Sequence, residues 1–554
     1  MPNLLRRPLT LLLMFLALFI AFDGLGDRKL ANPDEGRYSE IAREMAATGD
    51  FVTPRLNGLK YFEKPPMQYW ATALAFRLFG ESEWTARLYT ALCGLGCVLL
   101  MALVGWRLYD EETGLIAALV LLSAPYFAAL NEIVTLDMGL TFWMTLSLAG
   151  FLLAMNGPAA QARRWMLVAW AGAAGAVLSK GLIGIVFPAA GVGLYVLVQR
   201  DWALLKRLEW LRGAALFLLL AAPWFVAVSL ANAEFARFFF IHEHFERFLT
   251  TTHRRTEPAW FFLPILFAGF LPWALALLPA AWGGWRRAPA LTGDDHSFAP
   301  LTFILLFCAF ILAFFSASGS KLPAYILPMF PVLALVIAVY VRQVAAPRLA
   351  WLILPVVPVA LAGAWWAWHE PARRAREAST QVLYQSMSDW VVFAALAIAV
   401  AGLACFVLLR MGRKWPGVLV IALGTMVGVE SIERGYEQIS PLQSARALAA
   451  SITGHLGDGT RLYAVKHYEQ SLPFYLKRTV TLVEYVDEFE LGQNAEPGLS
   501  VAKLAELPAL WNAPGPAIAI IQPYRLEEMR ALGLAFEIIH QDPRRLALKK
   551  IPTP

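Results

Sequence analysis

The most restrictive feature of this sequence is a succession of apolar segments, each close to the length of a membrane-spanning helix. A helix needs about 20 apolar residues to cross a bilayer core, and about thirteen stretches of the chain approach that length. Hydrophobic residues make up 58% of the 554 residues and charged residues only 16%. The sequence therefore predicts an all-α polytopic membrane protein. We expect spans at 8–22, 84–108, 113–130, 138–155, 165–179, 182–199, 210–231, 260–283, 299–316, 325–343, 349–368, 390–410 and 416–431.

The basic residues of the short loops predict how these spans are oriented. Lys and Arg collect on cytoplasmic loops of membrane proteins, and here they recur in every second loop, beginning with Arg6 and Arg7. No small-x-small cleavage site follows the first apolar run, so we expect a retained first span with a cytoplasmic N-terminus. An odd number of spans then places the C-terminus outside. Because these loops explain the basic pI, no nucleic acid is expected as a partner.

After Ser431 the composition changes to that of a soluble domain. Short strand-like runs alternate with helix-like runs between 432 and 554, which predicts an external α/β domain behind a transmembrane domain at 1–431. The C-terminal domain has no glycine-rich phosphate loop, so no nucleotide cofactor is expected. We interpret it as a scaffolding or acceptor-docking module. A monomer is expected.

Charged residues are concentrated in the first external loop, 23–83. It holds the adjacent carboxylates Asp34 and Glu35 and, further on, a Tyr-Phe-Glu-Lys-Pro-Pro run that begins at Tyr61. Ionisable groups at a membrane boundary are costly and therefore usually functional. A simpler interpretation stays open for the carboxylates, because an acidic N-cap and first turn stabilise a helix by themselves.

Three sequence pieces in this loop carry a resemblance to a known family: DEGRYSEIAREM, GDF-TPRLNG and YFEKPPMQYW. With the pieces TLDMGLTFW, LSKG and SGSKLPAYILP, they make the chain similar to the GT-C membrane glycosyltransferases. Within that group it most resembles the 4-amino-4-deoxy-L-arabinose transferases of lipid A, which are relatives of the protein O-mannosyltransferases. The resemblance implies transfer of aminoarabinose from undecaprenyl phosphate to a lipid A phosphate, with inversion. It also implies a periplasmic active face in the bacterial inner membrane and a role in polymyxin resistance.

Candidate site residues follow from this resemblance and from the polar outliers of the external face. Carboxylates that position the sugar, or that act as a base, are Asp34, Glu35 and Asp137. Residues expected at the donor phosphate are Lys64, Arg37, Tyr61, Tyr325 and Lys321. Residues expected at the acceptor lipid are Arg254, Arg255 and Lys180. Lys180 and Lys321 lie at helix ends, so they could instead be snorkelling residues with no further role.

The second external loop, 232–259, contains the alternating histidines His242 and His244. We hypothesise a divalent metal such as zinc, held by Glu63 and His244. The alternative for this segment is an aromatic amphipathic helix that lies on the membrane. The segment His369–Asp389 is predicted as a basic external loop that could contact anionic membrane lipids.

Two other functional classes remain open from the sequence. One is a GT-C enzyme that transfers a different polyprenyl-phosphate sugar to a protein or glycan acceptor. The other is a lipid transporter or flippase, a class that tends to show inverted repeats and ionisable groups near the bilayer midplane. Here the ionisable groups gather at one interface and no repeat is evident, which favours the enzyme.

Overall fold

The computed structural model describes residues 22–246, 257–286, 298–375 and 377–551, together with 15 and 19, without the side chains of 243–246, 371, 372, 374 and 379. Within this part of the chain, seven helical units are long and apolar enough to cross a membrane, or up to nine if each of two bent pairs counts as one span. The seven are α4 (Glu83–Leu108), α7 (Leu136–Asn156), α10 (Trp210–Ala231), α15 (Pro300–Ala317), the α17–α18 unit (Ala346–Ile353 and Val356–Arg374), α19 (Ala378–Arg410) and α20 (Lys414–Glu437). The predicted helical membrane domain is confirmed.

The bent pairs correspond to predicted spans that the structure breaks in two. The stretch 113–130 forms α5 (Glu111–Leu122) and α6 (Pro125–Asn131), which meet at 70°. Pro125 lacks an N–H and so begins a new helix rather than continuing the first. The stretch 260–283 forms α13 (Phe262–Gly269) and α14 (Ala274–Arg286), bent by 104° around Pro272.

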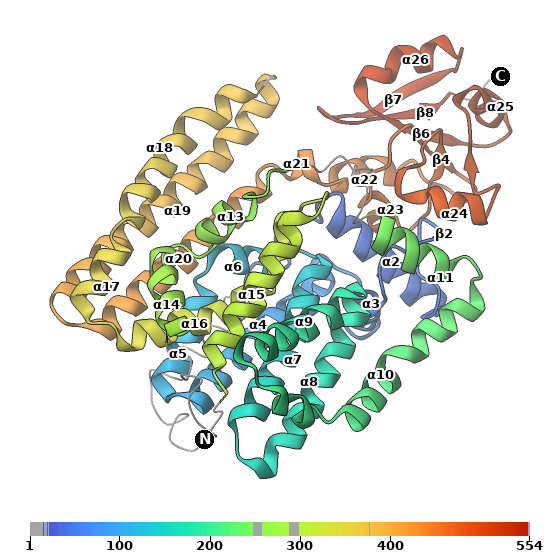
Figure 1. Cartoon of the computed structure of the whole chain (residues 1–554). Coiled ribbons are helices and arrows are strands. Elements are labelled where there is room, and N and C mark those ends of the chain that lie inside the picture. The colour runs from blue at the N-terminus through green and yellow to red at the C-terminus, as the bar shows by residue number, and fades with distance from the viewer. Residues whose placement is uncertain are drawn as a thin grey trace.

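Three further helices join the bundle: α8 (Ala159–Lys180), α9 (Ile183–Gln199) and α16 (Met329–Gln343). The predicted first span, 8–22, lies almost entirely outside the described residues, so the count of about thirteen spans stays a prediction. The loop predicted at 369–389 is wrong. Helix α18 continues to Arg374 and α19 begins at Ala378, and the two helices stand side by side at the edge of the bundle (Figure 1).

Small residues let the central helices approach closely, as is usual in lipid. A Cβ added at Gly172 of α8 would lie 2.5 Å from the backbone N of Ser147 in α7, and one at Gly150 of α7 would lie 2.6 Å from the N of Ala169 in α8. Helix α16 is buried along nearly its whole length and packs against α4, α5 and α14. The core of the membrane domain therefore lies around α16.

The first external loop is folded rather than open. It contains α2 (Asp34–Thr48), a two-stranded antiparallel ribbon of β1 (Arg55–Leu56) and β2 (Leu59–Lys60), and α3 (Met67–Phe79). Asp34 and Glu35 lie in the first turn of α2, as expected, but the N-cap is Pro33 rather than an acidic residue. The helix ends at Gly49 with φ 76°, a conformation that glycine adopts without strain. Helix α2 packs on α3 through Tyr38 and Tyr69, whose ring centroids are 6.1 Å apart.

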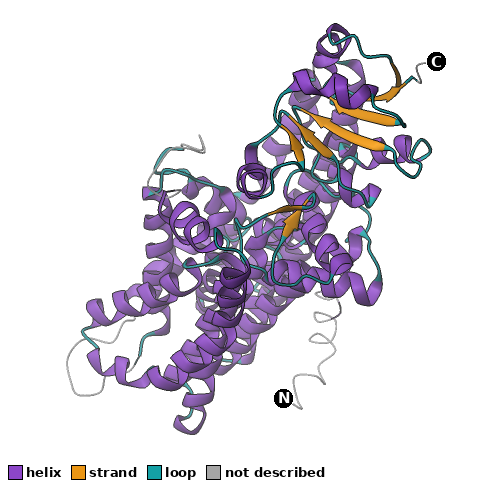
Figure 2. Cartoon of the chain, turned by 90° about the vertical axis from the view of Figure 1, so that its right-hand side faces the viewer, coloured by secondary structure: helices purple, strands orange, loops and turns teal. Residues whose placement is uncertain are grey.

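The C-terminal domain is built around a mixed six-stranded sheet with the order β5-β4-β3-β6-β8-β7 (Figure 2). Strands β3 to β6 are parallel to one another, and β8 and β7 complete the sheet in the antiparallel sense. The strands are β3 (Arg461–Val465), β4 (Thr481–Val483), β5 (Ser500–Val501), β6 (Ala517–Ile521), β7 (Phe536–Gln541) and β8 (Leu546–Lys550). The helices are α21 (Ser440–Gln443), α22 (Arg446–Thr453), α23 (Leu472–Leu476), α24 (Glu490–Ala495), α25 (Leu507–Asn512) and α26 (Leu526–Ala531).

One apolar cluster joins this domain to the first external loop. Ile41 and Met45 of α2 and Tyr69 of α3 are buried in the same cluster as Leu472 of α23 and Leu482 of β4. The domain sits directly over α2 and α3 (Figure 1). The loop and the C-terminal domain thus share a core, and their relative position is set by side-chain packing.

Candidate functional site

Glu35 is buried and fixes the loop to the membrane bundle. Both its oxygens accept hydrogen bonds from the Arg87 guanidinium of α4, at 2.8 and 2.9 Å. Its carboxylate also accepts the backbone N–H groups of Ala31 and Val134, at 3.0 and 3.1 Å. Burial alone would raise the pKa of Glu35, but the Arg87 charge and its hydrogen bonds outweigh this and lower the pKa to about 2. With 1% of its side chain exposed, Glu35 is placed to hold the loop rather than to meet a substrate.

Asp34, its neighbour, has the opposite surroundings. Its side chain is 47% exposed, and one oxygen lies 3.2 Å from the Arg37 guanidinium one turn further along α2. Arg37 in turn donates to Glu488 of the C-terminal domain at 2.9 Å. Burial raises the pKa of Glu488, and the Arg37 charge works against that rise. Asp34 is therefore the open carboxylate of the pair, beside a cation that the C-terminal domain holds in place.

Tyr61 and Lys64 lie on the segment between β2 and α3. The Tyr61 hydroxyl is buried and has no hydrogen-bond partner among the described residues. Burial raises the pKa of Tyr61, and the Glu63 charge adds to the rise. The Lys64 ammonium donates to the backbone carbonyl of Glu63 at 2.8 Å. Pro65 and Pro66 restrict the backbone immediately after Lys64, before α3 begins at Met67.

A second cluster joins three segments that are distant in the sequence. Asp137, in the first turn of α7, forms an ion pair with Lys180 at the end of α8. The Lys180 ammonium lies 5.1 Å from the ring centroid of Tyr325, in the short 3-10 helix η3 (Pro323–Ile326). Lys321 is buried and donates to the Ser318 carbonyl at 2.6 Å. Lys180, which the sequence analysis predicted to bind the acceptor lipid, thus lies beside Asp137 and Tyr325.

A short stretch of chain connects the first external loop to the cluster of Asp137, Lys180 and Tyr325. Val134, whose N–H is bound by Glu35, precedes Asp137 by three residues, so their Cα atoms can be at most about 11 Å apart. Asp34 is adjacent to Glu35 on the other side of that bond. The buried hydrogen bond from the Val134 N–H to Glu35 therefore links the backbone at Asp34 to the backbone at Asp137.

Part of the predicted site lies outside the described residues. This applies to Arg254, Arg255 and the side chain of His244. Over the described part of the chain, no three His, Cys, Asp or Glu side chains converge as a metal site would require. Because the proposed ligand His244 cannot be placed, the Glu63–His244 metal site stays a prediction.

An open cavity of about 670 Å³ separates the second external loop from the C-terminal domain. One side is formed by β2 and by the segment from α11 (Phe235–Arg237) into the π-helix η2 (Phe238–Glu246). Its polar lining residues are Lys60, Glu234, Arg237, His242, Glu490 and Asn494. Lys60 and Glu234 form an ion pair of 2.8 Å. Phe238, Ile241 and Leu491 add apolar surface, so the cavity suits an amphiphilic molecule.

The sequence reasoning missed Arg87, Asn32, Glu469 and Glu488. One signal was available for Arg87, which stands inside a predicted span, where a charged residue is costly and therefore has a buried partner or a function. The other three act across the junction with the C-terminal domain. No local pattern marks such long-range contacts.

The fold and the site together define a class: an integral membrane glycosyltransferase of the GT-C type. The family model "Dolichyl-phosphate-mannose-protein mannosyltransferase" matches residues 4–239, and "Aminoarabinose transferase C-terminal domain" matches residues 448–550. An archaeal oligosaccharyltransferase from Archaeoglobus fulgidus, 12% identical with a TM-score of 0.50 over 99% of this chain and 75% of that one, shares the fold alone.

Nearer relatives narrow the class to one family. The crystal structure of ArnT from Cupriavidus metallidurans bound to undecaprenyl phosphate superposes with a TM-score of 0.92, at 34% identity, over 98% of both chains. The chain belongs to the ArnT family of aminoarabinose transferases. An undecaprenyl phosphate-α-4-amino-4-deoxy-L-arabinose arabinosyl transferase of Pseudomonas aeruginosa (strain UCBPP-PA14) is 37% identical over 333 residues. That alignment spans 60% of this chain and 59% of the relative.

Proposed function

We propose that this protein transfers 4-amino-4-deoxy-L-arabinose from undecaprenyl phosphate to a phosphate group of lipid A, at the periplasmic face of the bacterial inner membrane. The observation that carries the proposal is the match over 98% of both chains to an ArnT structure bound to undecaprenyl phosphate. The arrangement of Asp34, Lys64 and the Asp137–Lys180 pair around the first external loop supports it.

The donor is activated by its own phosphate, so the protein's task is to neutralise and orient it. Lys64 supplies a cation on a backbone stiffened by two prolines. Tyr61 supplies a buried hydroxyl that has no partner among the described residues, and such a group gains when a phosphate oxygen accepts from it. Arg37, Tyr325 and Lys321 are proposed to contribute at the same phosphate.

Transfer is proposed as one in-line displacement with inversion. An anionic oxygen of the acceptor phosphate attacks the anomeric carbon, and the bond from that carbon to the donor phosphate oxygen breaks. The electron pair leaves with undecaprenyl phosphate. No proton has to be removed from an ionised acceptor phosphate, so Asp34 and Asp137 need only orient the sugar and balance the charge of its amine. Lys180 fixes the Asp137 carboxylate for that purpose.

The acceptor headgroup is proposed to approach from the second external loop. The open cavity there presents the cations Lys60 and Arg237 beside apolar Phe238 and Ile241, a combination that suits a phosphorylated glycolipid. Arg254 and Arg255 are proposed to assist. Attaching a cationic sugar lowers the negative charge of lipid A, which would weaken binding of the cationic antibiotic polymyxin.

The proposal includes a divalent metal ion such as zinc, held by Glu63 and His244. If it is required, chelator treatment of the purified protein will abolish transfer and added zinc will restore it. Metal analysis of the untreated protein checks this directly. Full activity after chelation, with no metal in the protein, would reject it.

The whole proposal is tested with purified protein in nanodiscs, supplied with undecaprenyl-phosphate-linked aminoarabinose and lipid A. We expect mass spectrometry to find lipid A carrying aminoarabinose, together with free undecaprenyl phosphate. Donor consumed only when a protein or glycan acceptor is supplied would favour the other GT-C acceptor class. Movement of labelled lipid across proteoliposomes with no covalent product would favour the transporter.

A further inference from the structure

Arg545 links Asp542 and Glu469 to the segment that follows helix α20. The side chain is 1% exposed and lies immediately before β8. Its guanidinium donates to the Ser444 carbonyl at 2.7 Å and to the Pro441 carbonyl, both in the segment that follows α20. It also donates to Asp542 at 2.8 Å and to Glu469 at 3.1 Å. One buried cation thus fixes Glu469 relative to the segment that leaves the membrane.

Glu469 extends this network to the first external loop. It is 4% exposed, and the oxygen that accepts from Arg545 also accepts from the Asn32 side-chain amide at 2.5 Å. The other Glu469 oxygen lies 2.7 Å from His467 Nε2. A carboxylate with this many partners has little freedom to move. Asn32 is therefore bound to a fixed acceptor.

Apart from its backbone carbonyl, every polar group of Asn32 forms a hydrogen bond with the C-terminal part of the chain. Its backbone N–H donates to the Gln443 carbonyl at 2.7 Å, and its side-chain oxygen accepts the Ser471 N–H at 2.8 Å. With the bond to Glu469, this makes three contacts at a residue two positions before Asp34. These contacts hold the backbone just before Asp34, whose carboxylate is proposed to orient the sugar.

Two contacts beyond Asp34 hold the other side of the same turn. A Cβ added at Gly36 would lie 2.4 Å from the Ser471 backbone N, so α2 touches the C-terminal domain at a point where only glycine fits. Arg37 binds Glu488 at 2.9 Å, and Gln470 holds the other Glu488 oxygen at 3.2 Å. The C-terminal domain therefore contacts the chain on both sides of Asp34, at positions 32, 36 and 37.

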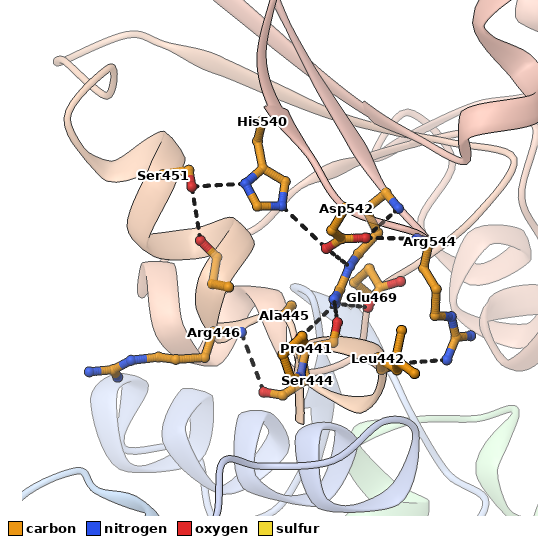
Figure 3. A network of polar contacts seen from close by, with 12 residues as sticks. Pro441, Leu442, Ser444, Ala445, Arg446, Ser451, Glu469, His540, Asp542 and Arg544 are labelled. Atoms are coloured by element: carbon orange, nitrogen blue, oxygen red, sulfur yellow. Dashed lines mark hydrogen bonds and ion pairs between the residues drawn. The ribbon is translucent and has the colours of Figure 1, made fainter. Parts of the chain in front are cut away.

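The same network contains a Ser–His–Asp sequence of contacts that does not form a nucleophile. His540 Nδ1 lies 2.8 Å from Ser451 Oγ and its Nε2 lies 3.2 Å from Asp542 (Figure 3). Ser451 Oγ, however, also donates to the Ala447 carbonyl at 3.1 Å, one turn back in α22, and this contact competes with His540 for its single proton. An activated serine gives that proton to the histidine. The contacts instead brace β7 against α22.

We propose that Glu469 and Arg545 are positioning residues for the transfer reaction: through Asn32 they hold Asp34 in the geometry that the transition state requires. The inference rests on the proposed function for its activity readout. It assigns the C-terminal domain a role in the chemical step without contact between these residues and substrate. Small displacements of a reacting group cost large factors in rate, which is why such a clamp matters.

The test compares Asn32→Ala and Glu469→Gln with a matched control, Glu527→Ala, in the same domain. Glu527 pairs with Arg530 on the exposed surface of α26 and touches nothing in the network. We expect each of the first two variants to lower kcat by about tenfold to a hundredfold. KM for the donor lipid and the binding of undecaprenyl phosphate should stay unchanged, because the phosphate-binding residues are intact. The control should match the wild type.

The double variant decides whether Glu469 acts through Asn32. If it does, combining the two substitutions will lower kcat little more than either alone. Fully multiplied losses, wild-type kcat in both single variants, or losses that appear in KM rather than kcat would overturn the inference. Arg545 is left unchanged in this test because its removal would strand buried carboxylates and could unfold the domain.

Hydrogen exchange supplies a readout that does not depend on activity. In Glu469→Gln, we expect the backbone amides of 31–37 to exchange at least about tenfold faster, while those of β3 and β6 keep their protection. If the wild type fails to transfer aminoarabinose but this local change appears, the proposed function fails and the clamp stands. Unchanged exchange at 31–37 in an active enzyme would overturn the clamp alone.

Discussion

At the scale of single residues, Asp34 and Glu35 are neighbours in the chain with opposite surroundings. Glu35 accepts four hydrogen bonds in a buried site, whereas Asp34 is half exposed beside Arg37. The adjacent pair could be recognised from the sequence as a candidate site. Which member faces solvent could not, because that depends on Arg87 and Val134, which lie far away along the chain.

Substituting each carboxylate by its amide distinguishes the structural role of Glu35 from the role proposed for Asp34 in transfer. Glu35→Gln leaves the buried Arg87 cation without its partner and should destabilise the protein by about 3–5 kcal/mol. Asp34→Asn should leave the unfolding temperature in detergent unchanged but lower kcat at least about a hundredfold, since it removes a charge aimed at the sugar. Thermal unfolding and transfer assays on the two variants check this. A stable, inactive Glu35→Gln with an active Asp34→Asn would reverse the assignment.

The pKa of Glu35 gives a pH dependence of stability with a defined sign. Its folded pKa of about 2 lies below the ordinary value of 4.5. The ion pair therefore contributes stability that is fully present above pH 4.5 and is lost as the pH falls toward 2, about 3 kcal/mol in all. Unfolding of the wild type should become easier over that window, and Glu35→Gln should show a flatter profile. Parallel profiles for the two proteins would contradict the assignment.

Lys64 is the residue on which donor recognition rests most heavily. Lys64→Ala should lower kcat/KM by about tenfold to a hundredfold by removing the cation nearest the proposed phosphate site. Lys64→Arg should keep part of the activity, since the charge remains. Equal kcat/KM for the alanine variant and the wild type would remove Lys64 from the mechanism.

At the scale of elements, the site is made where helix ends meet. Asp137 lies in the first turn of α7, Lys180 is the last residue of α8, and Tyr325 lies in the short helix η3, so the ends of two long helices and one short helix form the cluster. The sequence located these positions because polar residues interrupt apolar runs there. It did not show that Lys180 binds Asp137, since pairing between helix ends depends on how the bundle packs.

The Asp137–Lys180 pair can be tested against the far end of the same helix. Lys180→Ala frees the Asp137 carboxylate and should reduce transfer at least about tenfold. Arg163→Ala, in the first turns of α8 with 61% of the Arg163 side chain exposed, should have no effect. A loss of the same size in both variants would indicate general damage to α8 rather than a role for the pair.

Periodicity predicted most of the elements, and the failures have physical causes. The strand-like runs expected in the C-terminal domain are confirmed, for example as β3 and β6, and the helix expected to begin with Asp34 and Glu35 is confirmed as α2. The short strand β5 was missed because two residues carry no recognisable alternation. The loop at 369–389 is helical because its charged residues lie near the turn of a hairpin, and charge alone does not end a helix.

At the scale of the whole molecule, the first external loop and the C-terminal domain form one unit over the membrane bundle. They lie side by side (Figure 1) and share an apolar cluster and the polar contacts of Asn32. The sequence predicted both parts separately. The packing of the two parts against each other could not be predicted, because it is formed by residues more than 400 positions apart in the sequence.

The orientation of the chain remains a prediction and can be measured with single cysteines. The four natural cysteines are buried, so a new exposed thiol will dominate labelling. Glu527→Cys in the C-terminal domain should react with an impermeant maleimide in intact spheroplasts. Arg163→Cys, expected on the cytoplasmic side, should react only after permeabilisation. The opposite pattern would place the whole site on the wrong face for lipid A.

The central claim is that the Asp34–Lys64 face of this protein moves aminoarabinose from its lipid carrier to lipid A. The most direct measurement is mass spectrometry of lipid A from cells that lack the protein, complemented with the wild type, Asp34→Asn or Lys64→Ala at matched membrane levels. The account predicts aminoarabinose on lipid A with the wild type and at least about a tenfold loss with either variant. Unmodified lipid A with the wild type, or full modification with both variants, would contradict it.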